Sequence, residues 1–225
     1  MTLSKIAFLS VHTCPLAAPG QGKSGGMNVH VRQLATALGD MGVEVDIFTK
    51  EHIGQSDMIE PISSNVRVIH LRAGGVDVPL EDLFDHLPQF LEEFRRYQNE
   101  HGIKYQAIHS HYWMSGWVGQ EMVNYLNIPH VVTFHTLARI KMQSRPGERE
   151  SLKRQGTEKD IMRNADKVIA FSCESTSNCQ KSAQISHAPD IVHTCGSTSH
   201  LYNGTQGVFE QSHLGSAYLF SRNPA

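Results

Sequence analysis

The chain has 225 residues, enough for one large or two small domains, and its 40% hydrophobic and 19% charged residues are typical of globular proteins. A formal charge of -2 gives no general attraction to nucleic-acid phosphates or to an anionic membrane, so we expect neither as a partner. The four cysteines lack CxxC or other zinc-type spacing and no apolar run has the length of a transmembrane segment, so we expect a cytoplasmic protein without a disulfide framework.

Strand-like and helix-like segments alternate along the first 170 residues. Hydrophobic runs predict strands at Lys5–Val11, Val43–Thr49, Val66–Leu71, Ala107–His109, His130–Phe134 and Lys167–Phe171. Helical periodicity predicts helices over Met27–Leu38, Leu80–Glu100, Met114–Leu126 and a polar, exposed stretch, Glu148–Asn164. This order predicts an α/β domain over residues 1–190, a Rossmann-like, doubly wound parallel sheet. Residues 191–225 have weaker periodicity and read as a linker or tail.

The first loop that could bind a ligand is PGQGKSGGMN, Pro19–Asn28, between the first strand and the first helix. Ligands of such sheets bind beyond the carboxyl ends of the strands. Gly25 and Gly26 allow a close approach to backbone N–H groups at a helix start, which favours an anion, and Lys23 adds charge. The loop matches neither a P-loop nor GxGxxG, and a turn that merely connects strand to helix remains an equal alternative.

The second candidate is HSHYW, His109–Trp113, at the end of a strand. Its two histidines, together with His135, could be metal ligands, but no carboxylate or cysteine accompanies them in the sequence. We therefore predict hydrogen-bonded histidines and no metal site. Tyr112 and Trp113 could form a flat wall against a sugar ring, or could simply pack a helix onto the sheet.

The third candidate is TFHTLARIK, Thr133–Lys141, where His135 and Thr136 fall at the change from strand to loop. A histidine there could donate to a phosphate or a sugar hydroxyl, although a structural role is more common. Arg154 could bind phosphate, but Glu158 four residues later also predicts an ordinary surface ion pair.

Taken together, the three motifs resemble the N-terminal domain of glycosyltransferase family 4, with SGGMN, HSHYW and FHTLA as the specific cores. The resemblance covers about residues 3–172. Within the family, the pattern is most similar to D-inositol-3-phosphate glycosyltransferases and then to sucrose-phosphate synthase-like enzymes. It implies a GT-B architecture of two Rossmann-like domains, the first binding the acceptor and the second the nucleotide sugar. It also implies sugar transfer with retention of anomeric configuration.

Carried over residue by residue, the resemblance implies acceptor or donor contacts for His12, Gly25, Gly26, Asn28, Tyr112, Thr136 and Arg154, to which Lys23 is added for its charge. Tyr112, Thr136 and Arg154 match residues that hold the acceptor phosphate. His135 matches the histidine beside the donor sugar, and we expect it to be the catalytic residue. The acceptor is then a phosphorylated polyol or sugar, and the donor UDP-N-acetylglucosamine or UDP-glucose, with Mg²⁺ as an optional cofactor of the full enzyme.

The sequence departs from the family pattern in two loops and in length. Leu80 stands where a phosphate-binding lysine is usual, and Lys23 replaces an acidic residue, so the acceptor can differ from inositol phosphate. The family also has a second domain of similar size. We expect residues 191–225 to be a degraded interdomain linker and a vestige of the first donor-domain strand, Tyr218–Arg222.

Three hypotheses follow from these features. In the first, the chain is the acceptor half of a hexosyl- or N-acetylhexosaminyltransferase and is inactive alone, because transfer needs two domains closed around the substrates. In the second, it is a stand-alone sugar-phosphate-binding module, which could act as a homodimer or with a separately encoded donor domain. In the third, it is a truncated gene product without function. An absent donor half would also expose apolar surface near Trp113 or Phe134.

Overall fold

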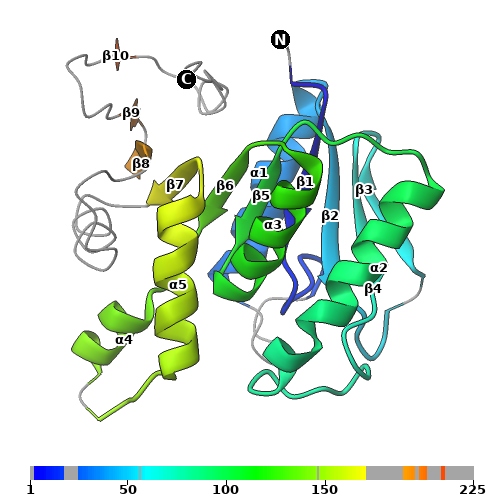
Figure 1. Cartoon of the computed structure of the whole chain (residues 1–225). Helices are drawn as coiled ribbons and strands as arrows, with labels where there is room; N and C mark the ends of the chain where they lie inside the picture. Colours follow the sequence, from blue (N-terminus) through cyan, green and yellow to red (C-terminus); the bar gives the residue numbers. More distant parts are fainter. Residues whose placement is uncertain are drawn as a thin grey trace. The chain divides into compact units, whose positions relative to one another are not determined.

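The computed structural model describes residues 3–17, 25–55, 57–145 and 147–170, and the backbone of three further strands at 190–195, 198–201 and 209–210. The chain divides into two compact units, Met1–His130 (unit 1) and Val131–Ala225 (unit 2). Figure 1 shows the elements of both.

Unit 1 is built on a five-stranded sheet in the order β5-β1-β2-β4-β3. Its strands are β1 (Lys5–Leu9), β2 (Glu44–Lys50), β3 (Ile59–Ser63), β4 (Val66–Leu71) and β5 (Ile108–His111). β1 pairs in parallel with both β2 and β5, and β2 pairs in parallel with β4. β3, which the sequence analysis did not predict, runs antiparallel to β4 at the edge of the otherwise parallel sheet.

Helices cover both faces of this sheet. They are α1 (Gly26–Asp40), the short 3₁₀ helix η1 (Leu83–His86), α2 (Leu87–Glu100) and α3 (Trp113–Leu126). Within unit 1, α1 lies on one face and α2 and α3 on the other (Figure 1), as right-handed crossovers in opposite directions require. The single helix predicted for Leu80–Glu100 begins as η1 and becomes α2 at Leu87, because Pro88 favours the first turn of a helix.

The core of unit 1 explains why its strands are so apolar. Ile6 to Leu9 of β1 are fully buried, as parallel strands covered on both faces should be. Phe48 of β2 lies 4.2 Å from Phe94 of α2 between ring centroids, which ties that helix to the sheet. At the other end of β2, the buried Asp46 accepts both Nε (2.6 Å) and Nη2 (3.1 Å) of Arg67, so its charge is paired.

Unit 2 contains a second set of parallel strands. Its described elements are β6 (His130–Thr133, of which only His130 belongs to unit 1), α4 (Ala138–Ser144), α5 (Leu152–Asn164), β7 (Lys167–Ala170), β8 (Asp190–Cys195), β9 (Thr198–Leu201) and β10 (Phe209–Glu210). β6, β7 and β8 are parallel neighbours, and β9 and β10 continue the sheet in antiparallel fashion. The predicted vestigial strand, Tyr218–Arg222, lies outside the described residues, and the boundary at residue 190 stays a prediction.

The polar helix predicted for Glu148–Asn164 begins later and is less exposed than expected. It starts after Ser151, whose hydroxyl accepts the backbone N–H of Arg154 as an N-cap. Arg154 and Glu158 are buried, together with Ile161 and Met162. Within the described ranges, no helix has the combination of length and hydropathy needed to cross a membrane.

Candidate functional site

The residues predicted to bind substrate are divided between the two units. Unit 1 contains His12, Gly25, Gly26, Asn28 and Tyr112, and unit 2 contains His135, Thr136 and Arg154. Lys23 lies outside the described residues. His12, Tyr112, His135 and Thr136 follow the carboxyl ends of the parallel strands β1, β5 and β6, the ligand-binding edge of a doubly wound sheet, whereas Gly26 and Asn28 lie in α1 and Arg154 in α5.

The start of α1 is open. Gly25 is the N-cap of this 15-residue helix, with an extended backbone and no side chain hydrogen-bonded to the cap. Gly25 and Gly26 are exposed, and a Cβ added to either would meet no atom of the described residues within 4 Å. The first N–H groups of a helix have no intrahelical partner and attract anions. Gly25 and Gly26 therefore suit a negatively charged group at the helix start.

Asn28 holds this loop in place from inside. It is 2% exposed, and its Nδ2 donates to the carbonyl oxygen of Cys14 (2.6 Å) and to Oγ1 of Thr13 (2.8 Å). Both acceptors belong to the loop after β1. In this structure Asn28 thus ties the first turn of α1 to that loop, and its predicted contact with a ligand remains a prediction.

Tyr112 joins β5 to α3, and its backbone has a conformation that residues other than glycine rarely adopt. Its φ of 77° and ψ of 159° are almost confined to glycine in other proteins. Its ring lies 4.4 Å from the ring of His12, and both residues are half-buried. The two predicted site residues of unit 1 that carry aromatic rings are therefore in contact.

The neighbouring residues of HSHYW belong to the core. His109 and His111 are fully buried, with ring centroids 4.2 Å apart. Trp113 is 5% exposed and stacks on Phe84, with centroids 5.0 Å apart and planes 17° apart. The structure therefore favours a packing role for Trp113 over a flat wall against a sugar ring. Phe134 is also buried, so neither side chain is itself exposed, and the exposure of apolar surface near them stays a prediction.

His135 follows β6 in a similarly strained turn. Its φ is 59°, and the N–H of Thr136 donates to the carbonyl oxygen of Phe134 at 2.6 Å, which closes a three-residue γ-turn. A γ-turn around a residue with positive φ is rare and strained. The turn leaves His135 half-buried and Thr136 exposed, so both side chains can be reached from solvent.

The guanidinium of Arg154 lies against this turn and contacts Thr136 and two glutamates. Its Nη2 contacts the carbonyl oxygen and Oγ1 of Thr136 at 3.1 and 3.2 Å. Its Nε donates to Glu158 (2.7 Å), and Nη1 lies 3.1 Å from Glu150. The surface ion pair predicted from the spacing therefore exists but is buried, because the guanidinium crosses from α5 to the strand-end turn. Burial raises the pKa of Glu158, and Arg154 offsets only part of that rise.

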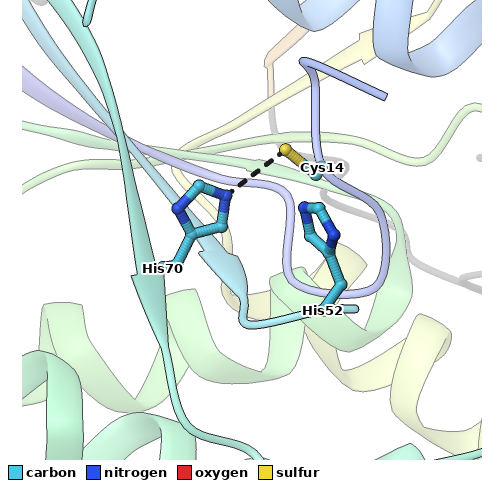
Figure 2. Close-up of side chains that lie close together, drawn as sticks. All are labelled: Cys14, His52 and His70. Carbon is cyan, nitrogen blue, oxygen red and sulfur yellow. Dashed lines mark hydrogen bonds between the residues drawn. The ribbon is translucent and has the colours of Figure 1, made fainter. Parts of the chain in front are cut away.

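A further cluster in unit 1, which the sequence analysis missed, consists of Cys14, His52 and His70 (Figure 2). One donor atom from each of the three side chains lies within 4.8 Å of the other two. Among the described residues this is the one group of three or more potential metal-ligating side chains so arranged. Its sulfur and imidazole donors are not a ligand set for Mg²⁺, which prefers oxygen.

Comparisons with known proteins agree with these features. Residues 24–178 match the family model described as Glycosyltransferase Family 4. The D-inositol 3-phosphate glycosyltransferase of Corynebacterium diphtheriae is 36% identical over 217 residues, which are 94% of this chain and 51% of that protein. The protein of the same name from Paenarthrobacter aurescens is 42% identical over 170 residues, 73% of this chain and 41% of that protein.

The solved structures give the same result. The sucrose-phosphate synthase from Thermosynechococcus elongatus superimposes with a TM-score of 0.76 and 33% identity, over 85% of this chain and 47% of that one. The chain thus spans about half the length of these similar proteins, or somewhat less.

Proposed function

Because this chain belongs to glycosyltransferase family 4, we propose that it binds the acceptor in a retaining transfer of a hexosyl or N-acetylhexosaminyl group from a nucleotide sugar. The acceptor in this proposal is a phosphorylated polyol or sugar. Its α/β, Rossmann-like fold is the one expected for half of a GT-B glycosyltransferase. Relatives named for D-inositol 3-phosphate support an acceptor of this class.

The observation that carries the proposal is the strained backbone of Tyr112 and His135. Each has a positive φ; Tyr112 directly follows β5, and His135 comes two residues after the end of β6. Such conformations disfavour a non-glycine residue by about 1–3 kcal/mol and cluster at active sites. Both residues are ones that the family resemblance assigns to substrate, so the strain supports the functional assignment independently of the sequence.

Recognition of a phosphate is supported by two features, one in each unit. In unit 1, the open start of α1 offers backbone N–H groups beside Gly25 and Gly26. In unit 2, the exposed hydroxyl of Thr136 lies 3.2 Å from the guanidinium of Arg154, so a phosphate bound by the threonine would be close to a positive charge. Leu80 is half-buried and offers no charge of its own.

In this proposal His135 acts at the reaction centre, beside the sugar that is transferred. The donor is UDP-N-acetylglucosamine or UDP-glucose. No step is assigned to Mg²⁺, because the one cluster of potential ligands that the described residues bring together does not suit it. The donor-binding half, which the family architecture requires, can be supplied by a separately encoded domain or by further sequence.

Calorimetry with D-inositol 3-phosphate, glucose 6-phosphate and unphosphorylated inositol tests acceptor binding. We expect the phosphorylated ligands to bind and inositol to bind far more weakly. Thr136→Val should weaken phosphate binding roughly tenfold or more, since a hydrogen bond to a charged group contributes about 1.5–3 kcal/mol. Gly26→Ala should also weaken binding, because the added methyl group hinders a close approach to the backbone N–H groups. It should preserve the fold, because no atom of the described residues lies within 4 Å of that methyl group.

Thr36→Val, in the middle of α1, is the matched control and should bind like the wild type. If no phosphorylated ligand binds, or if Thr136→Val and Gly26→Ala both bind as the wild type does, the proposal is wrong. Incubation with either UDP-sugar and inositol 3-phosphate tests transfer separately. Binding without transfer is the expected result for these 225 residues, and robust turnover would contradict the division into acceptor and donor halves.

A further inference from the structure

We propose that Cys14, His52 and His70 form a Zn²⁺ site in unit 1, with a water molecule as the fourth ligand. Figure 2 shows the thiol and the two imidazole rings pointing toward one another. They come from the carboxyl ends of three neighbouring strands. Cys14 lies in the loop after β1, His52 lies two residues beyond β2, and His70 is the second-last residue of β4.

The distances suit a tetrahedral zinc ion. Zn–S and Zn–N bonds of about 2.3 and 2.1 Å at a tetrahedral angle place sulfur and nitrogen about 3.6 Å apart. Sγ of Cys14 lies 3.5 Å from Nε2 of His70. The donor atoms of all three residues are within 4.8 Å of one another, so a shift of about one ångström in the His52 ring completes the geometry.

His52 is already in the tautomer that a metal needs. Its Nδ1 is 3.1 Å from the carbonyl oxygen of Ile53, and because a carbonyl oxygen only accepts, Nδ1 carries the proton. Nε2 then has a free lone pair, and that atom is buried without a hydrogen-bond partner. A buried nitrogen lone pair without a partner is unfavourable, and a metal ion in the cluster would satisfy it.

His70 has the outer carboxylate that usually accompanies a zinc-binding histidine. Its Nε2 faces Cys14, and its Nδ1, on the opposite side of the ring, lies 3.9 Å from Oε1 of Glu60 on β3. At 3.9 Å this contact is longer than a hydrogen bond, so in the proposed site Glu60 would have to move closer to orient the ring and keep the proton on Nδ1, which leaves Nε2 to bind the metal. His70 is 3% exposed, so its ring is enclosed by the surrounding core.

The donor set selects the kind of ion. One thiolate with two imidazoles suits Zn²⁺, whereas Mg²⁺ and Ca²⁺ require oxygen ligands. On binding, the thiol proton of Cys14 is released to solvent and the sulfur forms the bond to zinc, while both histidines bind as neutral imidazoles.

The site would stabilise the loop that leads to α1. The carbonyl oxygen of Cys14 accepts a hydrogen bond from Asn28, in the first turn of that helix. A metal bound to Cys14 would therefore fix the loop after β1 to β2 and β4 and, through Asn28, to the start of α1. The effect that we assign to it is on the stability of this loop, and it is independent of the acceptor proposal.

The experiment uses Zn²⁺ and its spectroscopic substitute Co²⁺ on the full chain freed of metal with a chelator. Cys173, Cys179 and Cys195 are first replaced by serine together, so that Cys14 is the only thiol. We expect one Co²⁺ per chain, with a thiolate-to-cobalt charge-transfer band and the strong visible bands of a four-coordinate ion. Zn²⁺ should displace Co²⁺ and raise the melting temperature.

Variants separate a metal site from a simple hydrogen bond between Cys14 and His70. Cys14→Ser and His52→Gln should abolish the charge-transfer band and the rise in melting temperature, and Glu60→Gln should weaken Zn²⁺ binding about 10- to 100-fold. His101→Gln, at an exposed histidine after α2, is the control and should bind like the parent. No Co²⁺ spectrum in the parent, or metal binding that survives Cys14→Ser, would overturn the assignment; circular dichroism confirms that each variant is folded.

Discussion

Arg154 and Glu158 lie one helical turn apart on α5 and join at 2.7 Å between Nε and Oε1, with side chains only 5% and 4% exposed. The same carboxylate accepts the backbone N–H of Ala138 at 2.9 Å, at the start of α4. Arg154 in turn contacts Thr136, in the turn around His135. The pair thus fixes the turn that carries the proposed catalytic histidine to α4 and α5.

Glu158→Ala should destabilise the protein by about 3 kcal/mol, because it leaves the buried guanidinium of Arg154 and the N–H of Ala138 with fewer partners. Asp160→Ala, two residues along the same helix and largely exposed, should stay within about 0.5 kcal/mol of the wild type. Urea denaturation of the two variants measures both changes. Equal stabilities would mean that the buried pair contributes nothing to the fold.

Gly119 of α3 faces a buried hydrogen bond between Oγ of Ser110 and Nε2 of His130, 2.9 Å long. A Cβ at this position would lie 2.5 Å from Nε2 of His130 and even closer to Oγ of Ser110, both fixed in the core. Gly119→Ala should therefore lower the free energy of unfolding by about 1–3 kcal/mol, as overpacking does elsewhere.

Gly156→Ala should give the opposite result at an exposed position of α5. Nothing lies within 4 Å of a Cβ at this position of α5, so the variant should gain about 0.5–1 kcal/mol from helix propensity. Both glycines are helical, and only their surroundings differ. Thermal denaturation of the two variants should shift the melting temperature in opposite directions; a gain at Gly119 would show that its neighbours move aside easily.

His130 makes stability depend on pH below neutrality. Complete burial lowers the pKa of His130 to about 3 in the folded protein. In the unfolded chain the value is about 6.5, so between these limits the unfolded state binds one more proton. The free energy of unfolding should therefore fall as pH falls through this window, by about 1.4 kcal/mol per pH unit from this group alone.

His130→Gln removes the imidazole that binds this proton. The free energy of unfolding should then depend less steeply on pH, whatever the variant does to absolute stability. Urea denaturation of both proteins between pH 7 and about 4.5 gives the two slopes. Nuclear magnetic resonance provides a second measure: the His130 ring signals should not titrate while the protein stays folded. Identical slopes, or a ring that titrates near neutral pH, would contradict the argument.

Much of the fold was predictable because it depends on local hydrophobic patterns. Val66–Leu71 was predicted with its observed bounds, and most other strands and helices within a few residues. β3 was not predicted, because Ile59–Ser63 contains Pro61 and no run of buried residues, as an edge strand allows. α4 was missed because its seven residues are too few for a helical period to show.

The candidate site was predictable to the extent that it follows strand ends. The positions of Tyr112 and His135 followed from that rule. Their strained backbone did not, because tyrosine and histidine, unlike glycine, carry no local signal for a positive φ. The burial of Arg154 depends on partners in a separate turn. Cys14, His52 and His70 have no common spacing in the chain, and only the strand order brings them together.

The strain at Tyr112 gives a test in which two variants differ by one methyl group. Tyr112→Gly and Tyr112→Ala both remove the ring that contacts His12, so both should weaken acceptor binding by the same factor. In an ordinary loop the alanine variant would be the more stable by about 0.4–1 kcal/mol, because glycine leaves the unfolded chain freer. At a φ of 77° and ψ of 159° the order should reverse, with glycine more stable by about 1–3 kcal/mol. Denaturation in urea and calorimetry with inositol 3-phosphate measure the two effects. If Tyr112→Ala is the more stable variant, the backbone at Tyr112 is relaxed. Backbone strain at the carboxyl ends of the strands then no longer supports the proposed site.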